Sequence, residues 1–325
     1  MPRAWNDRFT SFLPTLGFHH RYLDSSLFVK YLDVGVIILL VYVDDIIITG
    51  SDSNVINQVI AALTTEFQIT DMGDLHFFLG VQIVHTLAGL FLSQSNYIHD
   101  LLFKTDMYTA KPYATPYLPY QRLLKDDGEP FDNPSLYRNI VGALQYLTFT
   151  RPDIVFAVYQ VCQFMQHPFV DHFVVVKRIL RYLKGTLPYG ITYQKGSFNL
   201  KTFNDADWAS DPNDCRSTTG LAVFLDSNPI SWTSKKQHIV SRSSMEAEYR
   251  ALSTSFAKMD WIKQLLQFLR IPLPQTPVPF YDNLSAIALS FNPMQHQRTK
   301  HIEIDVHFVR ERVANNQLEV QFVSS

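Results

Sequence analysis

Residues 34–50 read VGVIILLVYVDDIIITG, the most apolar stretch of the chain, and they carry two adjacent carboxylates, Asp44 and Asp45. β-Branched residues on both sides predict two strands with the acidic pair at or near the bend. At about 4 Å and an effective dielectric of about 20, two like charges repel by roughly 4 kcal/mol. Either water at an exposed hairpin tip or a divalent cation must offset this repulsion. Hairpin tips prefer Asn-Gly or Asp-Gly, whereas isoleucines follow Asp45, and this favours the metal site.

The size and composition of the chain limit the classes of protein to which it can belong. Its 325 residues, 46% of them hydrophobic, suffice for two or three packed units. The formal net charge is −2, so binding to nucleic acid must depend on local basic patches and metal ions. The two cysteines, Cys162 and Cys215, lie far apart in the sequence, which argues against a disulfide scaffold or zinc site and fits a reducing compartment.

No segment has the pattern of a membrane anchor or a secretory signal. The longest apolar run ends at Asp44 and is shorter than the roughly 20 residues that a membrane helix needs. No basic region followed by an apolar segment opens the chain. We therefore expect no membrane partner and an intracellular protein, cytoplasmic or nuclear, that is not secreted.

The first part of the chain alternates helical and strand patterns. Hydrophobic periodicity and turn residues predict helices at residues 3–16, 54–66 and 95–104, and strands at 26–30, 34–49, 75–84 and 89–93. Residues 107–134 are rich in Pro and Tyr and are expected to form a surface linker.

An aromatic helical block follows at residues 135–184, and Arg151-Pro152-Asp153 interrupts it because proline disfavours helix at the preceding residue. Four cations share one face at helical steps near the end of this block: Lys177, Arg178, Arg181 and Lys184. They are either a solvated helix flank or a strip that tracks phosphates.

The last third has a different pattern, beginning after a break at residues 185–197. Strands are predicted at 200–208, 220–225, 229–234, 278–281 and 318–323, and helices at 244–269, 284–290 and 299–314. Three strands, a helix, and then a strand alternating with helices describe a mixed sheet covered by helices.

Glu248 is an acid in a position where an apolar residue is expected. Stepping back four residues from Leu252 along the apolar stripe of the predicted helix reaches Glu248. Glu246 lies off the stripe, and Ser243 three residues before it supplies the spacing of a capping box. A carboxylate turned toward a core is costly unless a cation or hydrogen bonds compensate it, so we expect a functional role for Glu248.

Two further acids complete a candidate metal site. Asp205 interrupts the strand 200–208 and shares a face with Asp207 and Phe203. Asp282 follows the strand 278–281, at the carboxyl end where sheets hold ligands, although simple capping of the next helix explains its position equally well. A strand, a helix and another strand that each offer one acid would form a site for Mg²⁺, which prefers oxygen ligands.

Several motifs resemble a known family. Tyr42-Val43-Asp44-Asp45 resembles the polymerase motif of reverse transcriptases, and its flanks resemble the Pol polyprotein of copia-type retrotransposons. Residues 74–80 (DLHFFLG), 137–144 (YRNIVGAL), 150–153 (TRPD) and 178–186 (RILRYLKGT) are similar to the same family. Residues 205–209 (DADWA), 231–237 (SWTSKKQ), 246–249 (EAEY) and 299–302 (TKHI) are similar to its ribonuclease H.

The resemblance implies a fold and a set of site residues. It implies a partial reverse transcriptase palm at 1–106, a linker and helical thumb or connection at 107–186, and a ribonuclease H-like domain at 187–325. The fold class is α+β and α/β: a truncated palm with a thumb-like block, then a mixed sheet flanked by helices. Asp44 and Asp45 would be catalytic, metal-binding palm carboxylates, and Asp205, Glu248 and Asp282 would be those of the ribonuclease H.

The implied chemistry is metal-dependent cleavage of RNA in an RNA–DNA hybrid. Paired Mg²⁺ ions about 4 Å apart, with Mn²⁺ as an alternative, would activate water and stabilise the leaving oxygen. The partner is an RNA–DNA hybrid or template nucleic acid, selected through helix shape and 2′-hydroxyl contacts.

Two departures from the family pattern affect the expected activity. The family needs another metal-binding Asp on an earlier strand, which would lie before Met1, and a fourth nuclease acid on a helix after Ser325. We therefore expect no DNA polymerisation by this chain alone, with the N-terminal part of the polyprotein as a further partner, and weakened hybrid cleavage. The alternative is a non-catalytic relic that at most binds nucleic acid through Lys177, Arg178, Arg181 and Lys184, or a recruited nucleic-acid-binding protein.

Overall fold

The structure is a computed structural model that describes residues 3–21, 24–43, 45–119, 121–291, 302–315 and 317–324. It divides into two compact units. The first comprises Met1–Phe78 and Asp260–Leu273, and the second comprises Leu79–Met259 and Pro274–Ser325. No helix in the described part of the chain is both long and apolar enough to cross a membrane.

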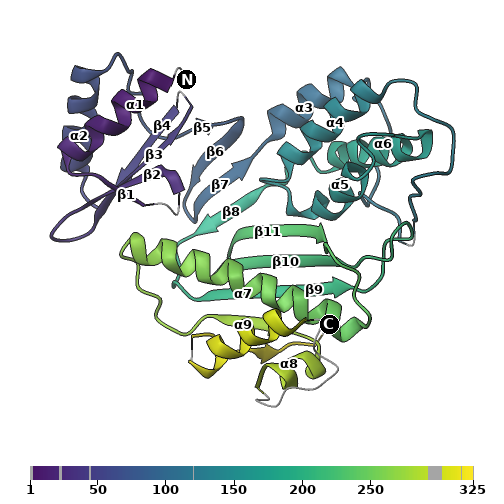
Figure 1. The fold of residues 1–325 in the computed structure, drawn as a ribbon. Coiled ribbons are helices and arrows are strands. Elements are labelled where there is room, and N and C mark those ends of the chain that lie inside the picture. The colour runs from purple at the N-terminus through teal and green to yellow at the C-terminus, as the bar shows by residue number, and fades with distance from the viewer. Residues whose placement is uncertain are drawn as a thin grey trace. The chain divides into compact units, whose positions relative to one another are not determined.

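An antiparallel sheet forms the first unit, with the order β1-β2-β3-β4 (Figure 1). Its strands are β1 (His19–Arg21), β2 (Asp24–Tyr31), β3 (Val36–Tyr42) and β4 (Asp45–Gly50). The other elements are α1 (Arg3–Phe12), the 3₁₀ helix η1 (Leu13–Leu16), α2 (Ser53–Glu66) and β5 (Phe77–Phe78). The predicted hairpin at 34–49 is confirmed as β3 and β4.

The apolar run in β3 is explained by burial on both faces of this sheet. Ile37, Leu39 and Val41 pack with side chains of α1 and α2. Ile38 and Leu40 alternate with them and pack against the cluster that includes Phe268, from the end of the long helix α7 (Ser244–Phe268). Because successive residues of a strand point to opposite faces, a strand covered on both sides is apolar throughout.

A helical block lies in the second unit. Its helices are α3 (Ser95–Lys104), α4 (Pro134–Leu147), the 3₁₀ helix η2 (Pro152–Ile154), α5 (Val155–Cys162) and α6 (Val170–Gly185). Their apolar faces form one core cluster. An antiparallel ribbon adjoins them in the chain: β6 (Val81–Thr86), β7 (Gly89–Ser93) and β8 (Ile191–Gln194). The predicted break at Arg151-Pro152-Asp153 is confirmed.

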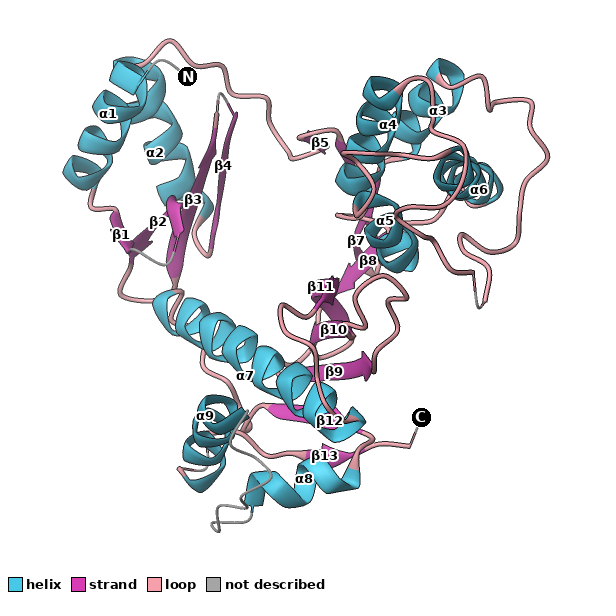
Figure 2. Ribbon diagram, turned by 45° about the vertical axis from the view of Figure 1, so that its right-hand side comes forward, coloured by secondary structure: helices cyan, strands magenta, loops and turns pink. Residues whose placement is uncertain are grey.

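A five-stranded mixed sheet with the order β11-β10-β9-β12-β13 positions the candidate site. Its strands are β9 (Leu200–Asp207), β10 (Thr218–Leu225), β11 (Asn228–Lys236), β12 (Val278–Tyr281) and β13 (Gln321–Phe322). The neighbouring helices are the first part of α7, then α8 (Leu284–Phe291) and α9 (Glu303–Ala314), as Figure 2 shows. β9 pairs antiparallel with β10 and parallel with β12.

The alternation of burial along β9 shows which face α7 covers. Thr202 and Asn204 are buried, whereas Phe203 and Asp205 are exposed. The Thr202 hydroxyl lies 3.5 Å from Sδ of Met259 on α7, so the even-numbered residues face this helix. The predicted mixed α/β chain with a helix-covered mixed sheet is confirmed.

Candidate metal centre

Asp205, Glu248 and Asp282 come together in the second unit. One carboxylate oxygen from each lies within 4.8 Å of the others. Asp205 is on β9, Glu248 is in the second turn of α7, and Asp282 directly follows β12. No other group of three or more His, Cys, Asp or Glu side chains in the described ranges has this spacing.

The topology of the sheet explains why these acids converge. β9 and β12 are parallel neighbours, with Phe203 paired to Phe280, so their carboxyl ends, each carrying an Asp, lie at the same edge. α7 begins over this edge and supplies Glu248 from its first turns. The Ala206 amide donates a 2.9 Å hydrogen bond to the Asp205 carboxylate, which fixes that side chain at the end of its strand.

Glu248 is the buried member of the group. Its exposed fraction is 8%. The pKa of Glu248 is raised to about 7, mainly by burial and also by the nearby charges of Asp205 and Asp282, while hydrogen bonds from the Tyr281 hydroxyl and the Ala206 amide act in the opposite direction. The charges of Asp205 and Asp282 disfavour the ionised form of Glu248. A cation bound among the three carboxylates would stabilise that ionised form.

The donor set fits a hard divalent cation. Three carboxylates and no nitrogen or sulfur ligand are the chemistry that Mg²⁺ or Mn²⁺ prefers. Asp205 is exposed and borders an open groove of about 370 Å³ that Phe156, Phe203 and Trp232 help to line. The cluster is therefore accessible from solvent rather than enclosed.

Asp207, on the same face of β9, lies outside the group of three. Burial raises the pKa of Asp207, and the charge of Asp205 adds to this effect. Glu246 is also separate from the cluster, because its carboxylate pairs with Arg250 at 2.7 Å and accepts the Arg242 amide at 2.9 Å. The Ser243 hydroxyl accepts the Glu246 amide at 3.3 Å, so the structural interpretation of Glu246 is confirmed, although its carboxylate binds the amide of Arg242 rather than that of Ser243.

Of the adjacent acids Asp44 and Asp45, the structure describes only Asp45. Asp45 begins β4, is exposed, and pairs with Tyr42 across the hairpin. Val43 has φ 52°, a left-handed conformation that is costly for a β-branched residue and is found chiefly where the surroundings enforce it. Asp44 lies outside the described residues, so a metal site at Asp44 and Asp45 stays a prediction.

The four cations on α6 have defined partners in the linker and on the helix. Arg181 donates to the Lys111 carbonyl at 2.7 Å, and Lys184 donates to the Ala110 carbonyl at 2.7 Å. Arg178 donates to the Thr115 hydroxyl at 2.7 Å. Lys177 lies over the ring of Phe173, 5.0 Å from its centre. Three of the four thus hold the linker, and contact with phosphates stays a prediction.

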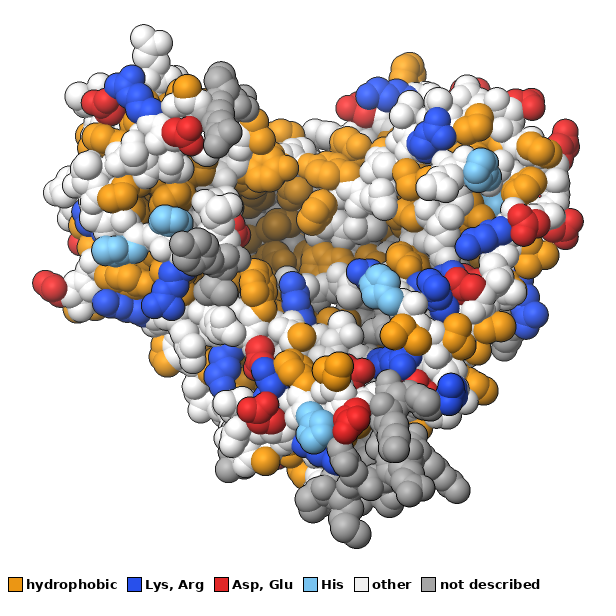
Figure 3. Space-filling view, in the orientation of Figure 1, with side chains coloured by type: hydrophobic (Ala, Val, Ile, Leu, Met, Phe, Trp, Pro, Cys, Tyr) orange, Lys and Arg blue, Asp and Glu red, His pale blue; other side chains and the backbone are white. Residues whose placement is uncertain are grey.

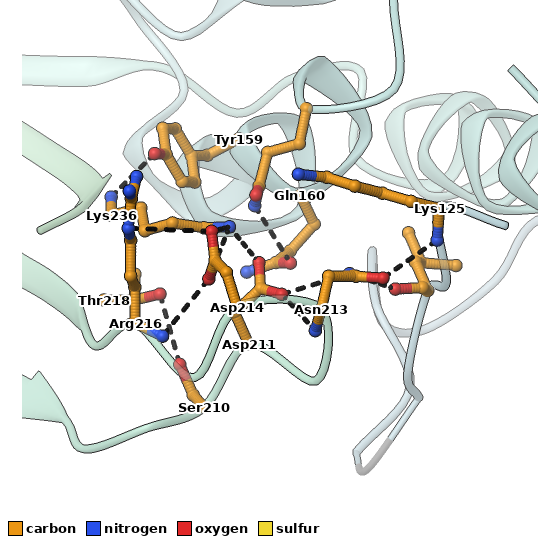
Figure 4. Close-up of polar contacts among 12 residues, drawn as sticks. Lys125, Tyr159, Gln160, Ser210, Asp211, Asn213, Asp214, Arg216, Thr218 and Lys236 are labelled. Atoms are coloured by element: carbon orange, nitrogen blue, oxygen red, sulfur yellow. Dashed lines mark hydrogen bonds and ion pairs between the residues drawn. The ribbon is translucent and has the colours of Figure 1, made fainter. Parts of the chain in front are cut away.

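A polar network fixes the loop that follows β9 (Figure 4). The Lys236 ammonium group forms ion pairs with Asp211 and, at 3.1 Å, with Asp214. The Lys236 amide donates to the Tyr159 hydroxyl on α5 at 2.7 Å, and Asn213 donates to the Leu123 carbonyl of the linker at 3.0 Å. The strand that carries Asp205 therefore ends in a loop held by β11 and by the linker.

Figure 3 shows the types of side chain on one face of the molecule. On the face drawn in Figure 3, acidic and basic side chains are interspersed, with no single large basic patch. This mixed pattern agrees with the formal net charge of −2.

The sequence did not predict that Tyr281 belongs to the site. The Tyr281 hydroxyl donates a 2.9 Å hydrogen bond to Glu248 Oε2, and Tyr281 is fully buried. A tyrosine on the inward face of a predicted strand needs a partner for its hydroxyl, and this requirement could have suggested the contact.

Comparison with known proteins identifies the family. Residues 1–119 match the family model described as reverse transcriptase (RNA-dependent DNA polymerase). The retrovirus-related Pol polyprotein from transposon RE1 of Arabidopsis thaliana is 46% identical over 325 residues, which are all of this chain and 22% of that protein. An uncharacterized mitochondrial protein of the same plant, AtMg00810, is 47% identical over 224 residues, 69% of this chain and 93% of that protein.

Among solved structures, an RNase H1 isolated from compost, LC11, aligns with a TM-score of 0.30 and 13% identity, over 39% of this chain and 85% of that one. The chain spans about a fifth of the length of the RE1 polyprotein. With close similarity along its whole length to that polyprotein and a reverse transcriptase segment at its start, the chain belongs to the family of copia-type retrotransposon Pol polyproteins.

Proposed function

We propose that this chain is a reverse transcriptase and ribonuclease H segment of a copia-type Pol polyprotein, and that it hydrolyses RNA in RNA–DNA hybrids. Residues 1–106 correspond to part of a polymerase palm, 107–186 to a linker and thumb-like block, and 187–325 to the nuclease. The observation that carries the proposal is the grouping of Asp205, Glu248 and Asp282 within 4.8 Å.

The three acids have distinct roles in this proposal. Asp205, exposed at the groove, faces the substrate. Glu248, buried beneath it, and Asp282, at the end of β12, hold the other side of the cation site. When bound, divalent ions would supply Lewis-acid activation of water and stabilisation of the leaving oxygen. The RNA strand would be distinguished by helix shape and 2′-hydroxyl groups rather than by base sequence.

The test is hydrolysis of a labelled RNA–DNA hybrid by the purified chain with Mg²⁺. We expect cleavage of the RNA strand and none of a DNA duplex of the same sequence. Asp205→Asn should lower the rate at least a hundredfold, because transition-state stabilisation by a bound ion contributes several kcal/mol.

Asp207→Asn is the matched control, since Asp207 lies two residues along the same face of β9 but outside the cluster. It should retain most of the activity. Hybrid binding without any cleavage by the native chain would contradict the proposal and favour a non-catalytic binding protein.

A further inference from the structure

Tyr281 contacts the candidate metal centre through its hydrogen bond to Glu248. Its neighbour Phe280 lies on the other face of β12, where it stacks on Phe203 with ring centres 5.1 Å apart. Alternation along the strand therefore turns Tyr281 inward. The side chain is fully buried, and its hydroxyl donates to Glu248 Oε2 at 2.9 Å.

This hydrogen bond restricts a side chain that would otherwise be free to turn. Glu248 reaches the site on a flexible stem and is repelled there by two other acids, Asp205 and Asp282. A hydrogen bond to a charged group is stronger than one between neutral groups, and the tyrosine ring that donates it is fully buried. The hydrogen bond from Tyr281 therefore holds the Glu248 carboxylate in one orientation despite its repulsion by Asp205 and Asp282.

We propose that Tyr281 is a positioning residue for Glu248, which it holds ready to bind a divalent cation. This inference rests on the proposed function only in requiring that a cation binds the cluster, and it does not require cleavage. Tyr281 would act through Glu248, to which its hydroxyl donates, and would not be a ligand of the cation. Partners that orient ligands in this way typically change metal affinity 10–100-fold when they are removed.

The neighbouring residue offers a matched control. Tyr249 follows Glu248 on α7 and is equally buried, but its hydroxyl has no hydrogen-bond partner among the described residues. Tyr281→Phe and Tyr249→Phe remove the same atom from two fully buried rings. Only the first change removes a contact with Glu248.

The experiment measures Mn²⁺ affinity of the full chain by calorimetric titration, with Asp205→Asn to identify the binding step that belongs to the cluster. Tyr281→Phe should weaken this step about tenfold, and Tyr249→Phe should leave it unchanged. Thermal melting confirms that each variant is folded. If Tyr281→Phe does not fold, Tyr281→Met takes its place, because it also lacks the hydroxyl donor but packs differently. It should weaken the same Mn²⁺ binding step.

Cleavage kinetics provide a second readout. Tyr281→Phe should need more metal for half-maximal hybrid cleavage, with the rate at saturating metal reduced far less. Equal Mn²⁺ affinity in the native chain and in Tyr281→Phe overturns the positioning role and leaves the proposed nuclease intact. A native chain without the Asp205-dependent binding step overturns both.

Discussion

Glu248 and Glu246 lie two residues apart on α7 and are both buried, but their electrostatic surroundings are opposite. Glu246 pairs with Arg250, whereas Glu248 has Asp205 and Asp282 nearby, and its pKa is raised to about 7. In the absence of metal, ionisation of Glu248 thus opposes folding.

The stability of the metal-free chain should depend on pH through Glu248. Because the folded state holds this proton more tightly than the unfolded chain, the contribution is present below the unfolded pKa and is lost as pH rises from about 4.5 to about 7. In EDTA, Glu248→Gln should therefore be more stable than the native chain at pH 8, by up to about 3 kcal/mol, and not at pH 4.

Melting curves of both proteins at several pH values check this difference. Glu246→Gln is the control and should be less stable than the native chain at pH 8, because it weakens a buried pair with Arg250. Parallel pH profiles for Glu248→Gln and the native chain would contradict the assignment.

Single residues differ in how far their roles can be predicted from the sequence. Glu248 was predictable because it stands in an apolar stripe at helical spacing, where a carboxylate is costly. The burial of Arg151 was not predictable: the sequence marked it as part of a break and of a family-like motif, yet it is fully buried, paired with Asp153 at 2.6 Å and bonded to the Thr186 carbonyl. Such partners depend on contacts between distant segments, which local patterns do not encode.

At the scale of elements, helix α6 illustrates how one basic face can have two interpretations. The linker residues 110–115 lie along it and are bonded by Arg178, Arg181 and Lys184. Arg178 and Arg181 also stack on Tyr113, at 4.7 and 4.0 Å from the ring centre. These contacts give the basic face of α6 a structural role, whether or not it also binds the phosphates of a nucleic acid.

Arg181→Ala should release the linker and increase its sensitivity to proteases, because it removes bonds to Lys111 and Tyr113 together with a cation–π contact. Lys177→Ala, on the same face but with its contact to Phe173 on the helix itself, should have little effect on cleavage within residues 107–120. Limited proteolysis read by mass spectrometry compares the two. Equal protection in both variants would mean that the strip does not hold the linker.

Elements with strong local signals were predicted well. The helix α3 and the strand β12 have the predicted bounds, and α2 begins one residue early behind its cap, Asp52. β1 and β8 were missed. β8 has four residues and pairs with β7, a strand far earlier in the chain, so its conformation depends on a distant partner rather than on its own sequence.

At the scale of the whole molecule, the net charge of −2 gives no general attraction to nucleic acid. The carboxylate cluster repels phosphates unless a cation neutralises it. Binding of a hybrid should therefore require divalent ions even when cleavage is not measured.

Fluorescence anisotropy with a labelled hybrid at fixed ionic strength tests this requirement. EDTA should weaken binding by the native chain severalfold, and Mg²⁺ should restore it. The double variant Asp205→Asn/Asp282→Asn should bind more tightly than the native chain in EDTA and respond little to Mg²⁺, since its repulsive charges are gone. Equal affinity of the native chain with and without EDTA would contradict this account.

The parallel pairing of β9 with β12 also has a consequence for biosynthesis. Between these two strands the chain must complete β10, β11 and α7, so the three acids cannot meet until the ribosome has translated past Asp282. A product terminated in α7 after Glu248 would carry Asp205 and Glu248 but would lack Asp282. Premature termination would thus release polypeptides that lack the assembled carboxylate cluster, and the proposed nuclease activity would require chains synthesised past Asp282.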